Sequence, residues 1–298
     1  MPKILILANH YAVASGRYMR DAFRRVGCEV RTMGHAMGNE IWGLCVQDEY
    51  VWEPTYPLDL HSSNFRQVPL TWIPDLTIAM DSALALHGFP GRTILYGVDN
   101  HVRDYKTLRM PFERWFLAHH DGPTQPVCEP CGHVWLPCAY DPSWFTPSPI
   151  PMHERAYDVA ILGVPYERRI KIVSVMKEAG LKTFASIGLL YGEYRDAYHN
   201  ARISLCVSAA GDVAQRIFET AAMGCAVLTD PCHDFEHLNF RDGHEGVIYE
   251  SDDEAVDKAR SLLSSPKELK RIASEGQEWA RPHTWDNRAK TILETMGL

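Results

Sequence analysis

The sequence contains no apolar run near the roughly 18 residues that a membrane-spanning helix requires, and no internal repeat or low-complexity segment is visible. An excess of basic residues is also lacking, because 30 Lys and Arg are outnumbered by 38 Asp and Glu, for a formal net charge of -8. This balance argues against tight non-specific binding of nucleic acid, although a local basic groove stays compatible with it. The amino terminus does not resemble a secretory signal, so we expect a cytoplasmic protein whose 8 cysteines are reduced thiols.

The Gly-x-Gly-x-x-Gly fingerprint of dinucleotide-binding folds is absent after the first apolar run, which removes the main support for a nicotinamide-dependent enzyme. Strand and helix patterns nevertheless alternate from the start of the chain. We expect a strand at residues 3–8, a helix at 17–26 and a second strand at 29–33. This order is typical of a doubly wound parallel sheet, which binds ligands at the carboxyl ends of its strands. A chain of 298 residues is long enough for two such domains.

Polar side chains follow three further apolar runs in the first half of the chain. These runs span residues 76–80, 93–98 and 115–118. Because the carboxyl ends of parallel strands converge on one edge, we expect Asp99, His101 and His120 to lie near one another. Imidazole and carboxylate groups at such an edge are candidates for acid–base work or for orienting a hydroxyl group. The alternative is that they cap the helices that follow, as Asp and Asn commonly do.

A cysteine pair in the first half has the spacing of a zinc site. Cys128 and Cys131 are followed by His133 and Cys138, which supply enough ligands for a structural metal. However, the apolar run at residues 134–136 predicts a strand that separates Cys138 from the cysteine turn, and no second Cys-x-x-Cys pair follows. The pattern therefore favours buried thiols over structural zinc, and we expect no metal and no tightly bound cofactor.

A proline-rich segment divides the chain, and the strand–helix rhythm begins again after it. Arg168 and Arg169 then lie in the first turn of a predicted helix that follows Gly163. Cations at a helix start oppose the helix dipole unless an anion binds there. The predicted domains are residues 1–145, a linker at 146–155, a second domain at 156–282 and a terminal helix at 283–298 that packs back on the first domain.

The segment from residue 212 to residue 230 has the pattern of a helix that ends at Gly224, followed by a buried strand. Arg216 and Glu219 are three positions apart on this helix, so they share one face. They could form a surface ion pair, or they could bind a charged and hydroxylated ligand at a helix start. Together with Arg168 and Arg169, the second interpretation is favoured, with a diphosphate as the anion.

The run RIFETAAMGCAVLTDP at residues 216–231 resembles a block in the donor domain of GT-B glycosyltransferases. A segment at 246–251 with Gly246 and Tyr249 in Gly-x-x-Tyr spacing follows, and two capped helices come after it, as in that family. The runs ILGVPYERR, VDNHVRDY and WLPCAYDPSWFTP resemble the CgeB-type, spore-maturation-like group in particular. The resemblance implies an α/β protein of the GT-B fold, with two Rossmann-like doubly wound domains, a cleft between them and a helical C-terminal tail.

By this resemblance, Glu219 would accept hydrogen bonds from the ribose of a nucleotide-sugar donor. Arg169 and Arg216 would hold the diphosphate, together with backbone N–H groups of residues 208–213. The donor-binding residues implied are Gly163, Arg169, Ser208, Asp212, Arg216 and Glu219. Asp99 and His120 would be the catalytic candidates on the acceptor side. His10, Tyr11 and His101, with an aromatic segment at residues 42–56, would border the acceptor.

The resemblance implies a hexosyl- or pentosyltransferase that needs no metal, which suits a chain without an Asp-x-Asp motif between strands. Many retaining relatives carry a second glutamate, facing the sugar, eight positions before the ribose-binding one. Gly211 stands there in this chain, with Asp212 beside it, so the donor sugar and the stereochemical outcome stay open. A non-catalytic sugar-nucleotide or glycan-binding protein and a nucleotide-sugar epimerase are the alternatives. The acceptor could be a glycan, a lipid-linked sugar, a protein, a small metabolite or a hydroxylated nucleobase in DNA.

Overall fold

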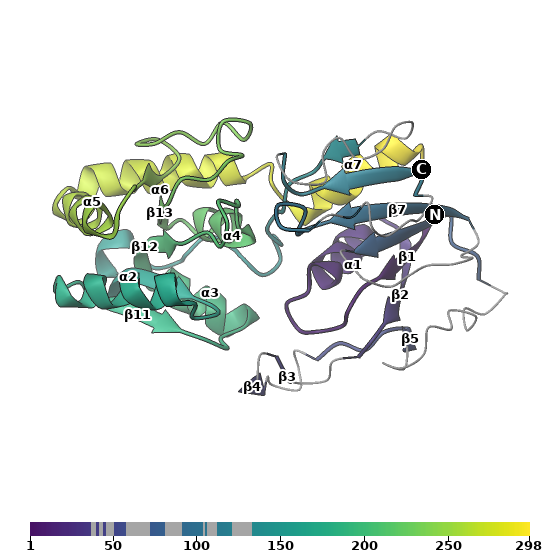
Figure 1. Cartoon of the computed structure of the whole chain (residues 1–298), viewed down its shortest axis with the longest axis horizontal. Helices are drawn as coiled ribbons and strands as arrows, with labels where there is room; N and C mark the ends of the chain where they lie inside the picture. Colours follow the sequence, from purple (N-terminus) through teal and green to yellow (C-terminus); the bar gives the residue numbers. More distant parts are fainter. Residues whose placement is uncertain are drawn as a thin grey trace. The chain divides into compact units, whose positions relative to one another are not determined.

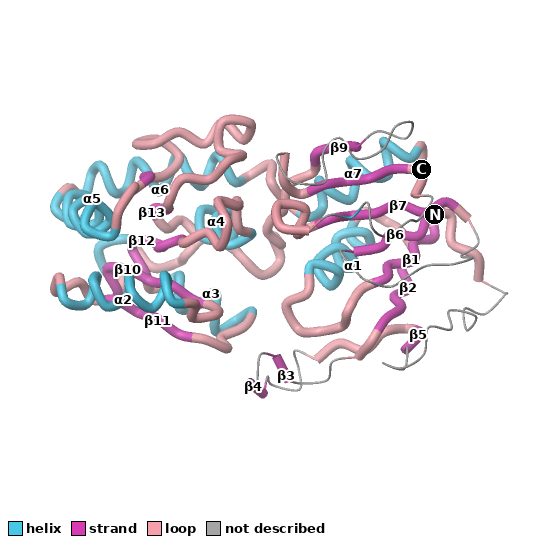
Figure 2. Tube along the Cα trace, viewed as in Figure 1, coloured by secondary structure: helices cyan, strands magenta, loops and turns pink. Residues whose placement is uncertain are grey.

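The computed structural model describes residues 1–36, 40–41, 44–45, 51–57, 72–80, 91–103, 105, 112–120 and 133–298. The chain forms two compact units, one of Met1–Pro137 with Trp285–Leu298 and one of Cys138–Thr284. The second unit therefore lies within the sequence of the first. Each unit is built around a parallel sheet with helices beside it (Figures 1 and 2).

The first unit contains a sheet of seven strands in the order β5-β2-β1-β6-β7-β8-β9, in which every pair is parallel. Its strands are β1 Lys3–Leu7, β2 Glu29–Gly34, β5 Tyr56–Pro57, β6 Leu76–Met80, β7 Arg92–Gly97, β8 Arg114–Leu117 and β9 His133–Trp135. Two short strands, β3 Glu40–Ile41 and β4 Leu44–Cys45, pair with each other in antiparallel fashion. Alternate residues of the central strands, such as Leu5 and Leu7, enter one buried cluster with Leu95, Leu117 and Trp115.

Helix α1, Ser15–Arg25, follows β1 closely because Gly16 has no side chain. A Cβ atom at this position would lie 2.6 Å from the Cβ of Ala8. The helix packs against α7, Trp285–Met296, at the end of the chain. Arg25 and Asp286 form an ion pair of 2.6 Å between these two helices. Trp285 is fully buried against Tyr96 of β7, so the last helix completes the core of the first unit.

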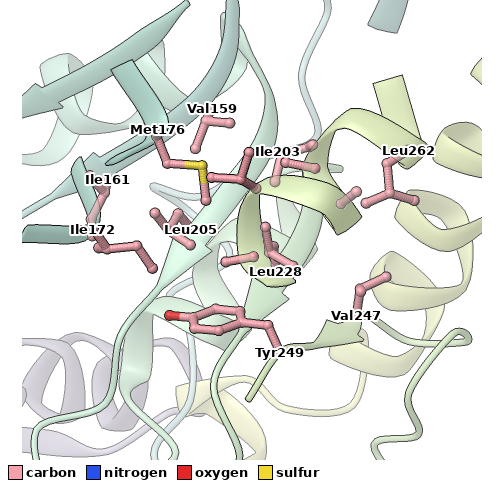
Figure 3. Packing of buried hydrophobic residues seen from close by; sticks show 14 of the residues in the cluster. Val159, Ile161, Ile172, Met176, Ile203, Leu205, Leu228, Val247, Tyr249 and Leu262 are labelled. Carbon is pink, nitrogen blue, oxygen red and sulfur yellow. The ribbon is translucent and has the colours of Figure 1, made fainter. Parts of the chain in front are cut away.

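The second unit contains a parallel sheet of five strands in the order β11-β10-β12-β13-β14. The strands are β10 Tyr157–Leu162, β11 Thr183–Ser186, β12 Ala201–Cys206, β13 Ala226–Thr229 and β14 Val247–Ile248. The helices are α2 Glu167–Glu178, α3 Tyr191–His199, α4 Gln215–Ala222, α5 Asp252–Ser264 and α6 Pro266–Ala280, after a 3-10 turn at Met152–Glu154. Figure 3 shows Ile172 and Met176 of α2 and Leu262 of α5 in one buried cluster with the strand residues Ile161, Ile203 and Leu228.

The proline-rich segment that the sequence analysis treats as a linker packs on the second unit. Trp144 lies 4.5 Å from the ring of Tyr191, and Ser148 donates to the carbonyl of His199. Arg155 donates to the carbonyls of Ala201 and Gly224, at 2.9 and 2.7 Å. These contacts explain why the division between the units falls after Pro137, before the prolines rather than among them. The composition of the segment resembles a linker, but its aromatic and polar side chains attach it to the unit that follows.

Candidate functional site

Four loops of the second unit leave its sheet at one edge, because β10, β11, β12 and β13 are parallel and each loop follows the carboxyl end of its strand. Two hydrogen bonds join neighbouring loops. The N–H of Gly163 donates to the carbonyl of Ser186 at 3.0 Å, and the N–H of Ser208 donates to the Asp230 carboxylate at 2.9 Å. This is the edge at which doubly wound sheets bind ligands, so the candidate site is built from these loops and the helix starts beside them.

Two arginines converge on Gly163, the first residue after β10. Gly163 has φ +115°, and a Cβ atom there would lie 2.6 Å from Nη2 of Arg216 and 3.2 Å from Nη1 of Arg169. Arg169 is 5% exposed and donates to the carbonyls of Val164 and Val207. Its guanidinium also lies over the ring of Tyr166, 4.3 Å from the ring centroid. We call the group formed by Gly163, Arg169 and Arg216 the arginine cradle.

The arginine cradle contains buried hydrogen-bond donors that are not used within the described part of the chain. Nε and Nη1 of Arg216, and Nε of Arg169, are buried and have no hydrogen-bond partner within the part of the chain that the structure describes. Burial and the nearby charge of Arg216 both lower the pKa of Arg169. Buried cations with unused donors are costly unless an anion joins them. The geometry therefore suits a phosphate or diphosphate group, which accepts hydrogen bonds from several N–H donors at once.

Glu219 lies one helical turn after Arg216 on α4 and is 6% exposed. Its carboxylate accepts a hydrogen bond of 2.7 Å from the hydroxyl of Tyr194 and another of 2.7 Å from the amide of Gln215. Burial raises the pKa of Glu219, while these two hydrogen bonds and the charge of Arg216 oppose the rise. The surface ion pair considered from the sequence is therefore wrong, because the carboxylate is buried. Each of its oxygens has a second lone pair for a ligand hydroxyl.

The backbone N–H groups at the start of the loop after β12 are used within the protein. The amides of residues 208–211 all donate to side chains of the same two loops: Ser208 to Asp230, Ala209 and Ala210 to Asp212, and Gly211 to Ser208. Asp230 is 2% exposed and also accepts from the hydroxyl of Ser208 and from Arg168, at 2.7 and 2.5 Å. Ser208 and Asp212 thus stabilise the loop through the amides of residues 208–211.

At the edge of the first sheet, where Asp99, His101 and His120 were expected to lie near one another, Asn100 connects two loops. Asn100 is fully buried, and its side chain exchanges two hydrogen bonds with the backbone of His119, at 2.7 and 2.8 Å. This pair joins the loops after β7 and β8 and brings the rings of His101 and His119 to 4.3 Å. His120 lies against Trp135, with 5.6 Å between ring centroids. Asn100 could not be singled out from the sequence, because a buried amide that bridges two loops has no sequence signature.

Asp99 and His10 are in different surroundings. The side chain of Asp99 is 39% exposed and lies 3.8 Å from Arg103. His10 is 1% exposed, its ring lies 4.0 Å from that of Trp52, and burial lowers its pKa to about 4. His10 is therefore neutral at physiological pH. Trp52 also donates to the backbone carbonyl of Tyr11 at 2.8 Å, which holds this loop together. Two other aromatic residues of the expected acceptor segment, Trp42 and Tyr50, lie outside the described residues.

The zinc-like cysteine pair, Cys128 and Cys131, also lies outside the described residues. His133 is exposed and Cys138 is buried. Within the described ranges, no three His, Cys, Asp or Glu side chains are grouped so that they could hold a metal ion. The helices of those same ranges include none that is both long and apolar enough to cross a membrane.

Comparisons with known proteins agree with this architecture. Residues 150–294 match the model of a family described as glycosyl transferase-like. No curated protein matches the chain in sequence. An α-glucosyltransferase solved with UDP and a 13-mer DNA superposes with a TM-score of 0.72 at 10% identity, covering 100% of both chains. Anabaena HepE solved with UDP and glucose gives 0.69 at 9% identity over 100% of both chains. A sucrose-phosphate synthase from Thermosynechococcus elongatus gives 0.65 at 11% identity, covering 99% of this chain and 98% of that one.

At such low identity the structural matches establish the fold alone. The chain has the GT-B fold, with two parallel sheets in two units, as the resemblance implied. The family match adds sequence support over the second unit, which carries the arginine cradle and Glu219.

Proposed function

We propose that this protein is a glycosyltransferase that moves a sugar from a nucleoside-diphosphate donor to an acceptor hydroxyl without a bound metal. The observation that carries the proposal is the arginine cradle, whose two buried guanidinium groups converge on Gly163 with unused donors. The match of residues 150–294 to a glycosyl transferase-like family supports it. We further assign the chain to the CgeB-type group, on the sequence runs that resemble it.

Each part of the cradle has a task in this reaction. Gly163 lets both guanidinium groups approach the backbone, where any side chain would displace them. Arg169 and Arg216 would bind the diphosphate and stabilise the negative charge that builds up on it as the glycosidic bond breaks. Two fixed guanidinium groups can supply the positive charge that a divalent cation supplies in other enzymes.

Glu219 would bind the ribose of the donor. Its carboxylate lies one turn beyond Arg216 on the same helix, held by Tyr194 and Gln215. A ribose offers two neighbouring hydroxyl donors, and a carboxylate can accept both. We take uridine as the first base to test, because UDP is bound in the structures of HepE and of the α-glucosyltransferase.

The first unit would hold the acceptor. Asp99 and His120 are the candidates for deprotonating or orienting its hydroxyl, and His10, Tyr11 and His101 for binding it. The solved α-glucosyltransferase is bound to DNA, so a hydroxylated nucleobase belongs in the acceptor panel, beside glycans, lipid-linked sugars, proteins and small metabolites. We place the activity in the cytoplasm and expect a hexose or a pentose as the transferred sugar.

Titration calorimetry with UDP, ADP, GDP and TDP tests the donor side. One of these nucleotides should bind the wild-type protein, and Arg216→Ala should weaken its binding about tenfold or more. Arg281→Ala is the matched control, because Arg281 is an exposed residue paired with Glu278 at the end of α6 in the same unit. If no nucleotide binds, or if Arg216→Ala binds as tightly as the control, the proposal is refuted.

Product analysis then separates transfer from the other chemistries of this fold. Incubation with the sugar form of the bound nucleotide and the acceptor panel should release free nucleoside diphosphate together with a glycosylated product. A changed donor sugar in the absence of acceptor would identify an epimerase instead. Tight donor binding without turnover on any acceptor would identify a binding protein.

A further inference from the structure

His233 occupies the space into which a side chain at position 211 would extend. Gly211 has φ +76°, and a Cβ atom built there would lie 2.5 Å from Nε2 and 2.8 Å from Cδ2 of His233. The imidazole thus fills the place that a larger residue would take on the loop after β12. Position 211 is also closed to other residues by its backbone, because side chains are strained at this φ.

The backbone around His233 is fixed to the same loop. Its N–H donates to the carbonyl of Gly211 at 2.9 Å, and the thiol of Cys232 donates to the carbonyl of Asp212 at 3.1 Å. Asp234, the next residue, is 2% exposed. The side chain of His233 itself is exposed. The structure therefore presents an accessible imidazole on a backbone that is anchored on both sides.

The order of groups along α4 gives the direction in which a donor bound to Glu219 and Arg216 would extend. Glu219, the ribose ligand of the proposed function, lies one turn after Arg216, and Gly211 lies on the chain before the helix starts at Gln215. A donor that places its ribose at Glu219 and its diphosphate at Arg216 extends in the direction of the helix start. Its sugar is the group at that end, on the side where Gly211 and His233 lie.

We propose that His233 is the sugar-contacting residue of the donor site and that it determines which sugar the protein accepts. This inference rests on the proposed function. A neutral imidazole donates one hydrogen bond and accepts one, whereas a carboxylate only accepts. The sugar position beside Gly211 is thus lined by a group that can donate a hydrogen bond and that, unlike a carboxylate, does not repel an anion. It can bind a hydroxyl group or the carboxylate of an acidic sugar.

The test compares the affinity for a nucleoside diphosphate with the affinity for its sugar form, which differ only in contacts with the sugar. Calorimetry with UDP, UDP-glucose and UDP-glucuronate, or with the matching pairs of another base if that base binds, gives the ratio of the two dissociation constants. His233→Ala should leave UDP binding unchanged and should shift the ratio about tenfold against the preferred sugar. His233→Gln, which keeps a donor and an acceptor near the position of Nε2, should restore most of the ratio.

The control is His153→Ala. His153 is exposed and lies before β10, at the amino ends of the strands and away from the loops of the site. It should bind all ligands as the wild type does, and the melting temperatures of all variants show whether each one folds.

The outcomes separate the two proposals. If the wild type binds none of the nucleotides, the proposed function fails and takes this inference with it. If UDP binds and the ratio in His233→Ala equals that of the wild type, only the assignment of His233 is overturned. Equal losses of affinity for UDP and for its sugar forms would also overturn it. They would mean that the imidazole contacts the diphosphate or stabilises the loops, and not that it contacts the sugar.

Discussion

Gly163→Ala is the substitution that most directly tests the arginine cradle. The added methyl group would lie 2.6 Å from Nη2 of Arg216 and 3.2 Å from Nη1 of Arg169, so at least one guanidinium must move. The backbone at φ +115° is strained for alanine, which costs about 1–3 kcal/mol of folding free energy. Each charge-assisted hydrogen bond lost to the anion removes about 1.5–3 kcal/mol of binding free energy, or roughly 10- to 100-fold in affinity.

A second glycine separates the backbone effect from the effect on the cradle. Gly180 closes α2 at φ +81°, and a Cβ atom there would have no neighbour within 4 Å. Gly180→Ala should therefore lower the melting temperature by a few degrees, as Gly163→Ala does, without changing nucleotide affinity. Melting curves and calorimetry on the two variants provide the comparison. If Gly163→Ala lost stability but bound the nucleotide as tightly as Gly180→Ala, the two guanidinium groups would not be the anion site.

Three further predictions concern buried polar groups. Glu219→Gln should abolish nucleotide binding yet melt at the same or a higher temperature than the ligand-free wild type at pH 7.5. Since burial raises the pKa of Glu219, the wild type loses stability as the pH rises through that pKa. The difference in melting temperature between Glu219→Gln and the wild type should hence narrow toward pH 4. A difference that stays constant with pH would show that the buried carboxylate is not its cause. Tyr194→Phe removes a donor to Glu219 and should lower the free energy of unfolding by about 1–2 kcal/mol and weaken nucleotide binding several-fold; denaturant titration and calorimetry measure the two effects. For His10, burial lowers the pKa to about 4, so stability should be lost as the pH falls from about 6.5 toward 4. His10→Phe should reduce that loss in melting curves recorded across this range, and an unchanged pH profile would show that His10 is not its source.

The strands and helices of the second unit could be predicted closely because their local patterns agree with their tertiary environment. Strand β13 follows the helix that ends at Gly224, as predicted, because its short apolar run is buried in a parallel sheet. Helix α4 lies within the segment where a helix was expected, and Gly224 closes it at φ +76° as predicted. The family resemblance in the same segment pointed to the GT-B fold, which the structural matches bear out.

The partners of the charged groups could not be predicted, because they come from distant parts of the chain. Tyr194 precedes Glu219 by 25 positions, and nothing in its own neighbourhood marks it as the donor to that carboxylate. Ser208 and Asp230 are 22 positions apart, and the backbone N–H of Ser208 donates to the Asp230 carboxylate. This bond occupies an amide that the family resemblance assigns to the ligand. His233 reaches the site only because two loops are joined there.

The way the chain enters and leaves the second unit has a consequence for how such proteins can change. The N–H of Tyr140 donates to the carbonyl of His283 at 3.0 Å, and Tyr140 forms a parallel bridge with Thr284. The second unit is thus an insertion in the sequence of the first, and backbone hydrogen bonding joins the two ends of the insertion. Recombination at these two adjacent junctions would exchange the whole unit, with the donor site proposed for it, while the core of the first unit remained intact. A single crossover would instead separate α7 from the α1 helix against which it packs. We expect that working chimaeras of this protein require both junctions.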